Sequence, residues 1–133
     1  MKRYVFTEEK RSALESLRQP FAIYQFIDKR VVTILLSDGF CDLFGYRDRA
    51  SAVYEMDNDM YKDDHPDDVA RIASDAVRFA TEGGKYDVVY WTKIRGTSDY
   101  MVMSTRGTIC LSGIYTLTSG LQKPDPAEQN SLE

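Results

Sequence analysis

The sequence contains one histidine, one tryptophan and two cysteines among its 133 residues. Zinc and iron sites draw on several histidines and cysteines at short spacing. The single histidine lies far along the chain from both cysteines, so we predict no metal ligand and no catalytic metal. With no export signal, Cys41 and Cys110 are expected to be reduced thiols that behave as small buried side chains.

Long apolar runs and basic clusters are also missing. No run approaches the roughly 20 apolar residues that cross a bilayer, and the N-terminus "MKRYVFTEEK" lacks the apolar core of a secretory signal. The net charge is −4, with lysines and arginines scattered along the chain. This distribution argues against a nucleic acid or a membrane as partner. We therefore expect one cytoplasmic domain.

The first part of the chain predicts a helix followed by a hairpin. "TEEKRSALESLRQP" is typical of a short helix capped by Thr7 and stopped by Pro20. The β-branched and aromatic runs 21–27 and 31–36, separated by "DKR", predict a β-hairpin with a short polar turn. The second run hardly alternates between apolar and polar residues, which predicts a central strand.

Two further helical signals follow the hairpin. A short helix is predicted to begin at Ser37 or Asp38 and to end at Gly45, with a second near 49–54. The longest helix is predicted from Pro66 to the glycines that follow Glu82. Its apolar face comprises Val69, Ile72, Ala73, Ala76, Val77 and Ala80.

The last part of the chain predicts three strands. Together with the hairpin they give an α+β fold, in which a five-stranded antiparallel sheet carries short helices and one long helix on one face, plus an N-terminal helix. The strands are expected at 85–94, at 99–111 and from 112 to about 120. We divide the chain into an N-terminal helical extension (1–20), a domain (21–118) and a disordered C-terminal tail (119–133).

The stretch "DDHPDDVARI" surrounds the only histidine, His65, with four aspartates. A calcium loop of the EF-hand type beginning at Asp57 would need Gly and Glu where the chain has Lys62 and Asp68. Catalysis by His65 would need a nucleophile, and no motif such as G-x-S-x-G is present. Pro66 followed by carboxylates instead predicts a helix start, with Asp68 reaching back to a backbone N–H. A metal stays open for the surplus acids Asp57, Asp59, Asp63 and Asp64.

The sequence resembles a PAS domain over about 21–117. The resemblance is carried by "LFGY" after the first hairpin, by "HPDD" at the start of the long helix, and by three closing strands that begin with "GGKYDVVYWTKI". It implies that the sheet and the helices enclose a pocket. It also implies a sensory or regulatory role, often in a homodimer. In bacterial signalling proteins such domains often precede a diguanylate cyclase (GGDEF) or a histidine kinase domain.

The resemblance also bears on cofactors. Light-sensing PAS domains with flavin carry a cysteine in a "GxNCRFLQ"-like motif, where this chain has "DNDMYKDDH", and Cys41 lies in an earlier helix. Haem-binding members commonly use an axial histidine on the long helix. His65 stands at the very start of that helix and is expected to face solvent. We therefore expect neither flavin nor haem.

The interior between the long helix and the sheet is the candidate ligand pocket. Apolar residues at such spacing are usually core, so that alternative stays open, and strand facing could shift by one residue. Tyr24, Tyr90, Thr92 and Ser104 are the polar groups available to a ligand. The candidate pocket residues are Tyr24, Phe26, Phe44, Ile72, Ala76, Val88, Tyr90 and Met103.

We predict a regulatory module that senses a signal or ligand, or mediates dimerisation, for an output domain elsewhere in the parent protein. Leu14 and Leu17 could pack across a homodimer or onto the chain's own sheet. The nine tyrosines suggest a partly exposed sheet face available for association. The alternative is a small-molecule binding domain with a dedicated ligand. An enzyme is disfavoured because nucleophile motifs, phosphate loops and metal spacing are missing.

Overall fold

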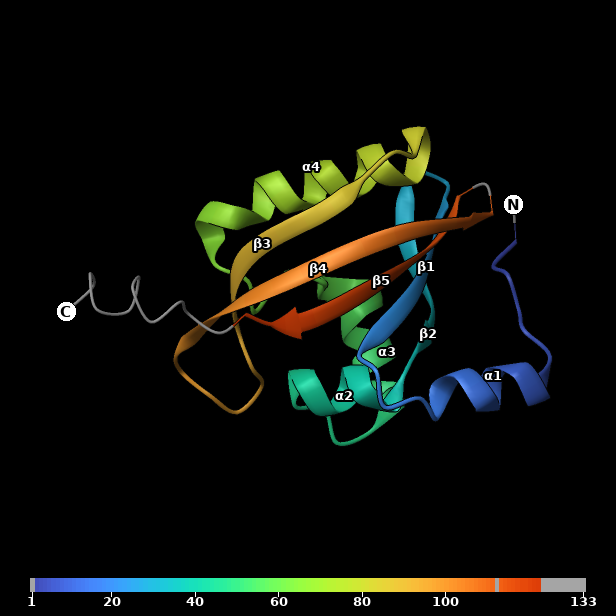
Figure 1. Ribbon diagram of the computed structural model, residues 1–133, viewed down its shortest axis with the longest axis horizontal. Coiled ribbons are helices and arrows are strands. Elements are labelled where there is room, and N and C mark those ends of the chain that lie inside the picture. Colours follow the sequence, from blue (N-terminus) through green and yellow to red (C-terminus); the bar gives the residue numbers. More distant parts are fainter. Residues whose placement is uncertain (1, 112, 123–133) are drawn as a thin grey trace.

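One antiparallel sheet organises the chain, in a computed structural model that describes residues 2–111 and 113–122. The five strands lie in the order β2-β1-β5-β4-β3. Figure 1 shows β4 and β5 crossing the middle of the molecule, with β3 at one edge and β2 at the other. The fold class predicted from the sequence is confirmed. The strands are β1 (Phe21–Ile27), β2 (Arg30–Leu36), β3 (Tyr86–Lys93), β4 (Tyr100–Leu111) and β5 (Ile114–Leu121).

The first hairpin turns through Asp28 and Lys29, whose φ angles are 50° and 66°. A two-residue loop with both residues at positive φ matches the right-handed twist of the flanking strands. The prediction that the second strand is central was wrong, because β2 is an edge strand. Its apolar residues are explained by cover on both faces, from α3 (Arg49–Asp59) on one side and α1 (Glu8–Glu15) on the other.

Three helices cover the inner face of the sheet. In Figure 1, α4 (Pro66–Glu82) runs alongside β3, while α2 (Asp38–Phe44) and α3 gather near β1 and β2. Gly45 ends α2 at a φ of 81°, as predicted. The main core lies between these helices and the sheet. Alternate residues of β1, such as Ala22 and Tyr24, point into it.

The outer face of β1 and β2 is covered by the N-terminal segment. Phe21, Ile23 and Leu35 form a second, smaller core with Ile114 on this face. Leu14 of α1 packs against it. The buried side chain of Gln25 accepts a hydrogen bond from the Tyr4 backbone N–H at 2.7 Å. The N-terminal extension is therefore docked onto the sheet.

The buried face of α4 differs in rotation from the predicted one. Phe79 is 1% exposed, whereas Val77 is 43% exposed. Ile72, Ala76 and Ala80 are buried as expected. The predicted stripe counted only aliphatic positions. A large aromatic side chain at Phe79 buries more apolar area than the branched one at Val77, and this sets the rotation.

The C-terminal boundary of the domain lies later than predicted. Strand β5 continues to Leu121, and Ser119 pairs with Thr105 across the β4–β5 ladder. Residues 119–121 therefore belong to the sheet, and the rest of the predicted tail from 123 onward lies outside the described residues. Within the described residues, no helix is both long and apolar enough to span a membrane.

Candidate functional site

A cavity of about 80 Å³ lies between the inner face of the sheet and the helices. A buried water needs roughly 10–15 Å³ on a comparable measure, so the space holds several waters or a small molecule. Side chains from all five strands except β2, and from α2, α3 and α4, contribute to its wall. The lining includes Ala22, Tyr24, Phe40, Phe44, Met56, Met60, Ile72, Ala76, Thr92, Thr105, Leu117 and Ser119.

Tyrosine side chains make up much of the remaining wall. Their positions on different elements bring phenol groups together from the strands and from the α3–α4 connection. The expectation that the tyrosines lie on an exposed sheet face is therefore wrong for most of them. Six of the nine tyrosines line the cavity: Tyr24, Tyr46, Tyr61, Tyr86, Tyr90 and Tyr115.

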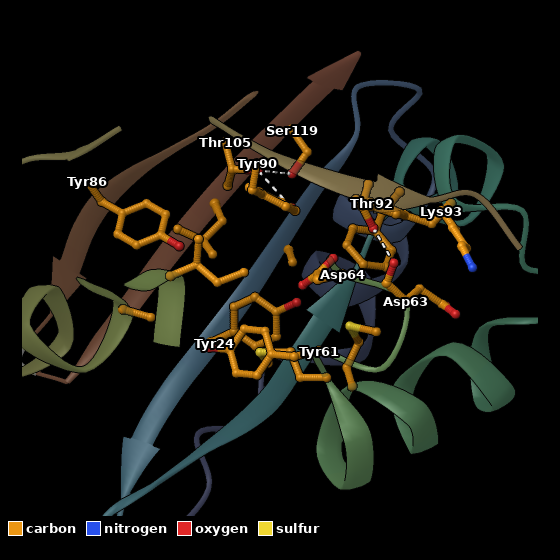
Figure 2. A pocket seen from close by; sticks show the side chains of 18 of the residues that line it. Tyr24, Tyr61, Asp63, Asp64, Tyr86, Tyr90, Thr92, Lys93, Thr105 and Ser119 are labelled. Carbon is orange, nitrogen blue, oxygen red and sulfur yellow. Dashed lines mark hydrogen bonds between the residues drawn. The ribbon is translucent and has the colours of Figure 1, made fainter. Parts of the chain in front are cut away.

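Some of these hydroxyls are paired within the protein. The Tyr90 hydroxyl lies 3.2 Å from Oγ1 of Thr105, which lies 3.0 Å from Oγ of Ser119 (Figure 2). The Tyr46 hydroxyl donates to Glu55 at 2.6 Å. Glu55 also accepts from Lys62 and Arg95. Burial acts to raise the pKa of Glu55, but these three donors hold the pKa at about 2.

The other phenols have no such partner. Among the described protein atoms, the hydroxyls of Tyr24, Tyr61, Tyr86 and Tyr115 have no hydrogen-bond partner. Tyr24 is only 4% exposed, and burial raises its pKa well above the usual value. None of these oxygens is sealed off by protein, since the one fully buried side-chain oxygen without a partner in the described residues is Oγ1 of Thr33. These hydroxyls are therefore available to a molecule inside the cavity.

Asp64 is held against the edge of the sheet. It forms an isolated antiparallel bridge with Thr92 of β3. The backbone N–H of His65 donates to the Trp91 carbonyl at 2.8 Å, and the Lys93 N–H donates to the Asp63 carbonyl at 2.9 Å. Figure 2 shows the side chains of Asp63 and Asp64 pointing in different directions. Figure 2 shows the Asp64 carboxyl between Tyr24 and Tyr61 on one side and Tyr90 and Thr105 on the other.

The environment of Asp64 disfavours its charged form. Burial raises the pKa of Asp64 to about 6, with the negative charges of Asp63 and Asp68 acting in the same direction and the Thr92 hydroxyl opposing them. The ammonium group of Lys93 does not face it. Its Nζ lies 4.8 Å from the centre of the Tyr100 ring, and Figure 2 shows Lys93 and Asp63 pointing away from the tyrosines.

The acidic stretch is a helix start, as the sequence predicted. His65 is the N-cap of α4, its Nδ1 accepts from the Asp67 N–H at 3.1 Å, and Pro66 opens the helix. The predicted capping contact of Asp68 was wrong. Its carboxylate accepts a hydrogen bond from the backbone N–H of Trp91 at 2.9 Å instead. This N–H is available because β3 is an edge strand.

Of the surplus acids, Asp57 accepts a hydrogen bond from the Thr33 N–H at 2.7 Å and pairs with Arg3. Asp64 lines the cavity. Among the described residues, no three His, Cys, Asp or Glu side chains are arranged to hold a metal ion.

The predicted pocket residues divide into two groups. Three do not line the cavity, although each lies on the inner face of its strand. Met103 is fully buried, Phe26 packs at the far end of β1, and Val88 lies between two tyrosines of β3 whose longer side chains reach past it. Five do line it: Tyr24, Phe44, Ile72, Ala76 and Tyr90.

Several lining residues were missed from the sequence. Thr92 lines the cavity as suggested, but Ser104 does not, and its neighbour Thr105 does. This is the one-residue change of facing that strand alternation leaves open. Asp64 was considered as a residue at the helix start and as a surplus acid open to a metal, but not as a lining residue of the pocket. The β-bridge to Thr92 turns it inward, and no local signal predicts a contact between positions this far apart.

The two cysteines, the tryptophan and the leucines of the N-terminal helical extension lie away from the cavity. Cys41 is buried in α2, as expected, but Cys110 is exposed near the end of β4. Trp91 is 49% exposed on the outer face of the sheet. Leu14 packs on the chain's own sheet, while Leu17 is 44% exposed. The homodimer predicted through this pair stays a prediction.

Similar solved structures are sensory domains. A LOV (light-oxygen-voltage) protein of Rhodobacter sphaeroides shares 11% identity, with a TM-score of 0.69 over 93% of this chain and 71% of that chain. The LOV domain of a blue-light activated histidine kinase from Erythrobacter litoralis shares 14% identity, with a TM-score of 0.59 over 81% and 99%. A LOV domain described with a flavin analogue shares 16% identity, with a TM-score of 0.63 over 91% and 89%.

These likenesses define the fold. LOV domains are a subfamily of PAS domains, so the chain has the PAS fold, and the resemblance seen in the sequence is confirmed at that level. No family model matches the sequence, and no curated relative matches it.

The prediction on cofactors has to be corrected. Flavin was set aside because one cysteine motif is missing, yet several similar structures are LOV domains, one of them described with a flavin analogue. A fold can be shared without that motif. Among the described residues that line the cavity, none is a cysteine. A cavity of about 150 Å³ holds benzene, so the three fused rings of a flavin would enter this smaller space only after its walls move apart.

Proposed function

We propose that this chain is a sensory domain whose cavity binds a small-molecule signal, and that occupancy of the cavity regulates an output domain in the parent protein. The observation that carries the proposal is the cavity itself, where a partly buried carboxyl and unpaired phenol hydroxyls converge. A few convergent polar groups in an otherwise apolar enclosure are the usual features of a ligand site.

The elements around the cavity are linked to the N-terminal segment. Asp57 of α3 binds both Arg3 and the Thr33 backbone of β2. Arg49, which begins α3, donates to the carbonyl of Leu36 at 3.0 Å and to that of Glu15 at 3.0 Å. A ligand that moves α3 would therefore disturb the hydrogen bond between Arg49 and α1. In this proposal α1 is the element that transmits the occupancy of the cavity to a neighbouring domain.

The proposed function needs an output domain that the sensory domain regulates. The similar structures include a LOV domain of a histidine kinase, which supports a kinase as readily as a diguanylate cyclase. In this role the chain is regulatory rather than catalytic. A homodimer through Leu17 remains compatible with its exposed position on the N-terminal segment, whereas Leu14 is already engaged with the sheet.

Ligand binding is tested on the whole chain. Native mass spectrometry and an absorption spectrum of the purified protein detect a co-purifying molecule, flavin included. Thermal unfolding with a panel of amines, alcohols, carboxylic acids and flavins then ranks ligand classes, since a ligand specific for the folded state raises the melting temperature.

A matched pair of variants locates the binding. Ala76→Leu adds bulk to the cavity wall, and Ala70→Leu adds the same bulk at an exposed position of α4. We expect the ligand response to be lost in the first variant and kept in the second. The proposal fails if no ligand class stabilises the protein, or if both variants respond alike. Hydrogen exchange of α1 with and without ligand tests the regulatory part, and slower exchange on binding is the expected result.

A further inference from the structure

The charges that face the cavity are unbalanced. Three ionisable side chains other than tyrosines line it: Asp63, Asp64 and Lys93. Lys93 lies over the Tyr100 ring and Asp63 points away from the tyrosines (Figure 2). Within the described part of the chain, Asp64 is therefore the ionisable group that enters the space, and no cation of the protein accompanies it there.

The hydrogen-bonding groups show the same imbalance. An ionised carboxylate only accepts hydrogen bonds, and each phenol or alcohol oxygen has lone pairs to accept as well. Among the described lining residues, Lys93 is the one that carries a nitrogen in its side chain. A molecule rich in N–H donors therefore complements this wall better than one rich in acceptors.

The aromatic rings add a second preference. Organic cations are attracted to the faces of Tyr and Trp rings, and clusters of such rings recognise ammonium groups. Here Tyr24 and Tyr61 lie on one side of Asp64, and Tyr90 lies on the other (Figure 2). A positive group beside the carboxylate would have aromatic rings around it and would remain desolvated, where cation–π attraction is strongest.

We propose that the cavity binds a small organic cation, an alkylammonium ion with fewer non-hydrogen atoms than benzene, whose N–H groups bind the Asp64 carboxylate and the tyrosine hydroxyls. This inference rests on the proposed function and names the ligand class of the same site. The volume of about 80 Å³ sets the size limit. The raised pKa of Asp64 agrees with this proposal. A bound cation would supply the counter-charge that the carboxylate lacks in the free protein.

Other ligand classes fit less well. An anion would be repelled by Asp64 at close range. An uncharged apolar molecule would leave the carboxyl and the free hydroxyl of Tyr24 without partners, which is costly for buried groups. A neutral alcohol satisfies some hydroxyls but brings no charge.

The test uses three molecules of matched shape: propylammonium, 1-propanol and propionate. Each is titrated into the whole chain at pH 7.5, and amide shifts of cavity residues are followed by NMR. A ligand of four non-hydrogen atoms reaches a Kd of about 40 μM at best, and a Kd of about 1 mM is within reach. We expect propylammonium to bind and the other two to bind at least about tenfold more weakly.

Two variants of neighbouring residues complete the design. Asp64→Asn should weaken propylammonium binding at least about tenfold. Asp63→Asn should weaken it much less, because the Asp63 carboxylate points away from the tyrosines. Binding to wild type should also weaken as the pH falls through about 6, where Asp64 becomes protonated.

The outcomes separate the two proposals. Equal affinity for the amine and the alcohol, or equal weakening in both variants, overturns the cation proposal. If the amine fails while another class in the panel binds in the cavity, the cation proposal falls and the sensory function stands. If no class binds, both fall.

Discussion

Asp64 and Thr92 face each other across an isolated antiparallel bridge at the edge of β3. The chain enters α4 directly from this bridge, and the hydrogen bond from His65 to the Trp91 carbonyl fixes the entry point. In the same stretch, the Asp64 carboxylate points toward the tyrosines and that of Asp63 points away from them (Figure 2). Helix start and cavity chemistry are thus set by one short stretch of backbone.

Replacing Asp64 with Asn should stabilise the empty protein at neutral pH. The folded-state pKa of about 6 lies above the usual 3.8, so the unfolded chain loses its proton first as the pH rises. Wild-type stability therefore falls between about pH 4 and pH 6 and stays lowered above that, by up to about 3 kcal/mol. Tyr61 and Tyr90 face Asp64, and the nearby carboxylates of Asp63 and Asp68 also act to raise its pKa.

Urea unfolding at several pH values measures this effect. The difference between Asp64→Asn and wild type should be small near pH 4 and reach its maximum above pH 6. Asp63→Asn serves as control and should show a much smaller growth, because the Asp63 charge raises the pKa of Asp64 less than burial does. A variant that is no more stable than wild type at pH 7.5 would contradict a raised pKa at the partly buried Asp64.

Asp68 should stabilise the folded protein at neutral pH, which is the opposite of the effect of Asp64. The hydrogen bond from the Trp91 N–H and the contact with Arg71 lower the pKa of Asp68, against a desolvation effect that raises it. Its stabilisation is present above the usual pKa near 3.8 and is lost as the pH falls through the folded value. We expect Asp68→Ala to cost about 1–2 kcal/mol at pH 7. Asp67→Ala, exposed in the same helical turn, should cost less in the same unfolding experiment.

Ser37 joins three backbone segments. Its hydroxyl accepts from the N–H groups of Phe21 and Phe40 and donates to the Gln19 carbonyl at 2.7 Å. Because the side chain is fully buried, Ser37→Ala leaves these groups unpaired and should cost about 2–3 kcal/mol of unfolding free energy. The exposed Ser74→Ala is the control, and equal effects of the two changes would refute the role assigned to Ser37.

The hairpin turn offers a stabilising change. Lys29 has a φ of 66°, a conformation that costs a non-glycine residue roughly 1 kcal/mol. Lys29→Gly should therefore raise the unfolding free energy by a few tenths to about 1 kcal/mol, after the entropy that glycine adds to the unfolded chain. Arg30→Gly, one residue later in β2, should lower it. Thermal unfolding of both variants distinguishes the turn from the strand.

Local signals in the sequence predicted the elements well. Pro66 with its following carboxylates located the start of α4, and Gly45 located the end of α2. These features depend on a few neighbouring residues, so a sequence pattern is enough. The position of β2 at the sheet edge was missed, because cover from α1 and α3 makes an edge strand as apolar as a central one.

The cavity was harder to predict, since it depends on contacts across the fold. Tyr24 and Tyr90 were found because they lie on inward positions of strands. Asp64, Tyr61 and Tyr115 were missed. Tyr61 and Asp64 lie in the irregular stretch before α4, and Tyr115 lies on β5, where the sequence did not settle which residues point inward. Only the β-bridge to Thr92 brings Asp64 to the tyrosines.

The most direct test of the site is a titration of the Asp64 carboxyl carbon by ¹³C NMR, alone and with saturating propylammonium. The account predicts a pKa of about 6 for the free protein and a value shifted down toward the usual 3.8 when the cation is bound. The same pKa in both samples would contradict it, because a cation seated against this carboxylate must favour its ionised form.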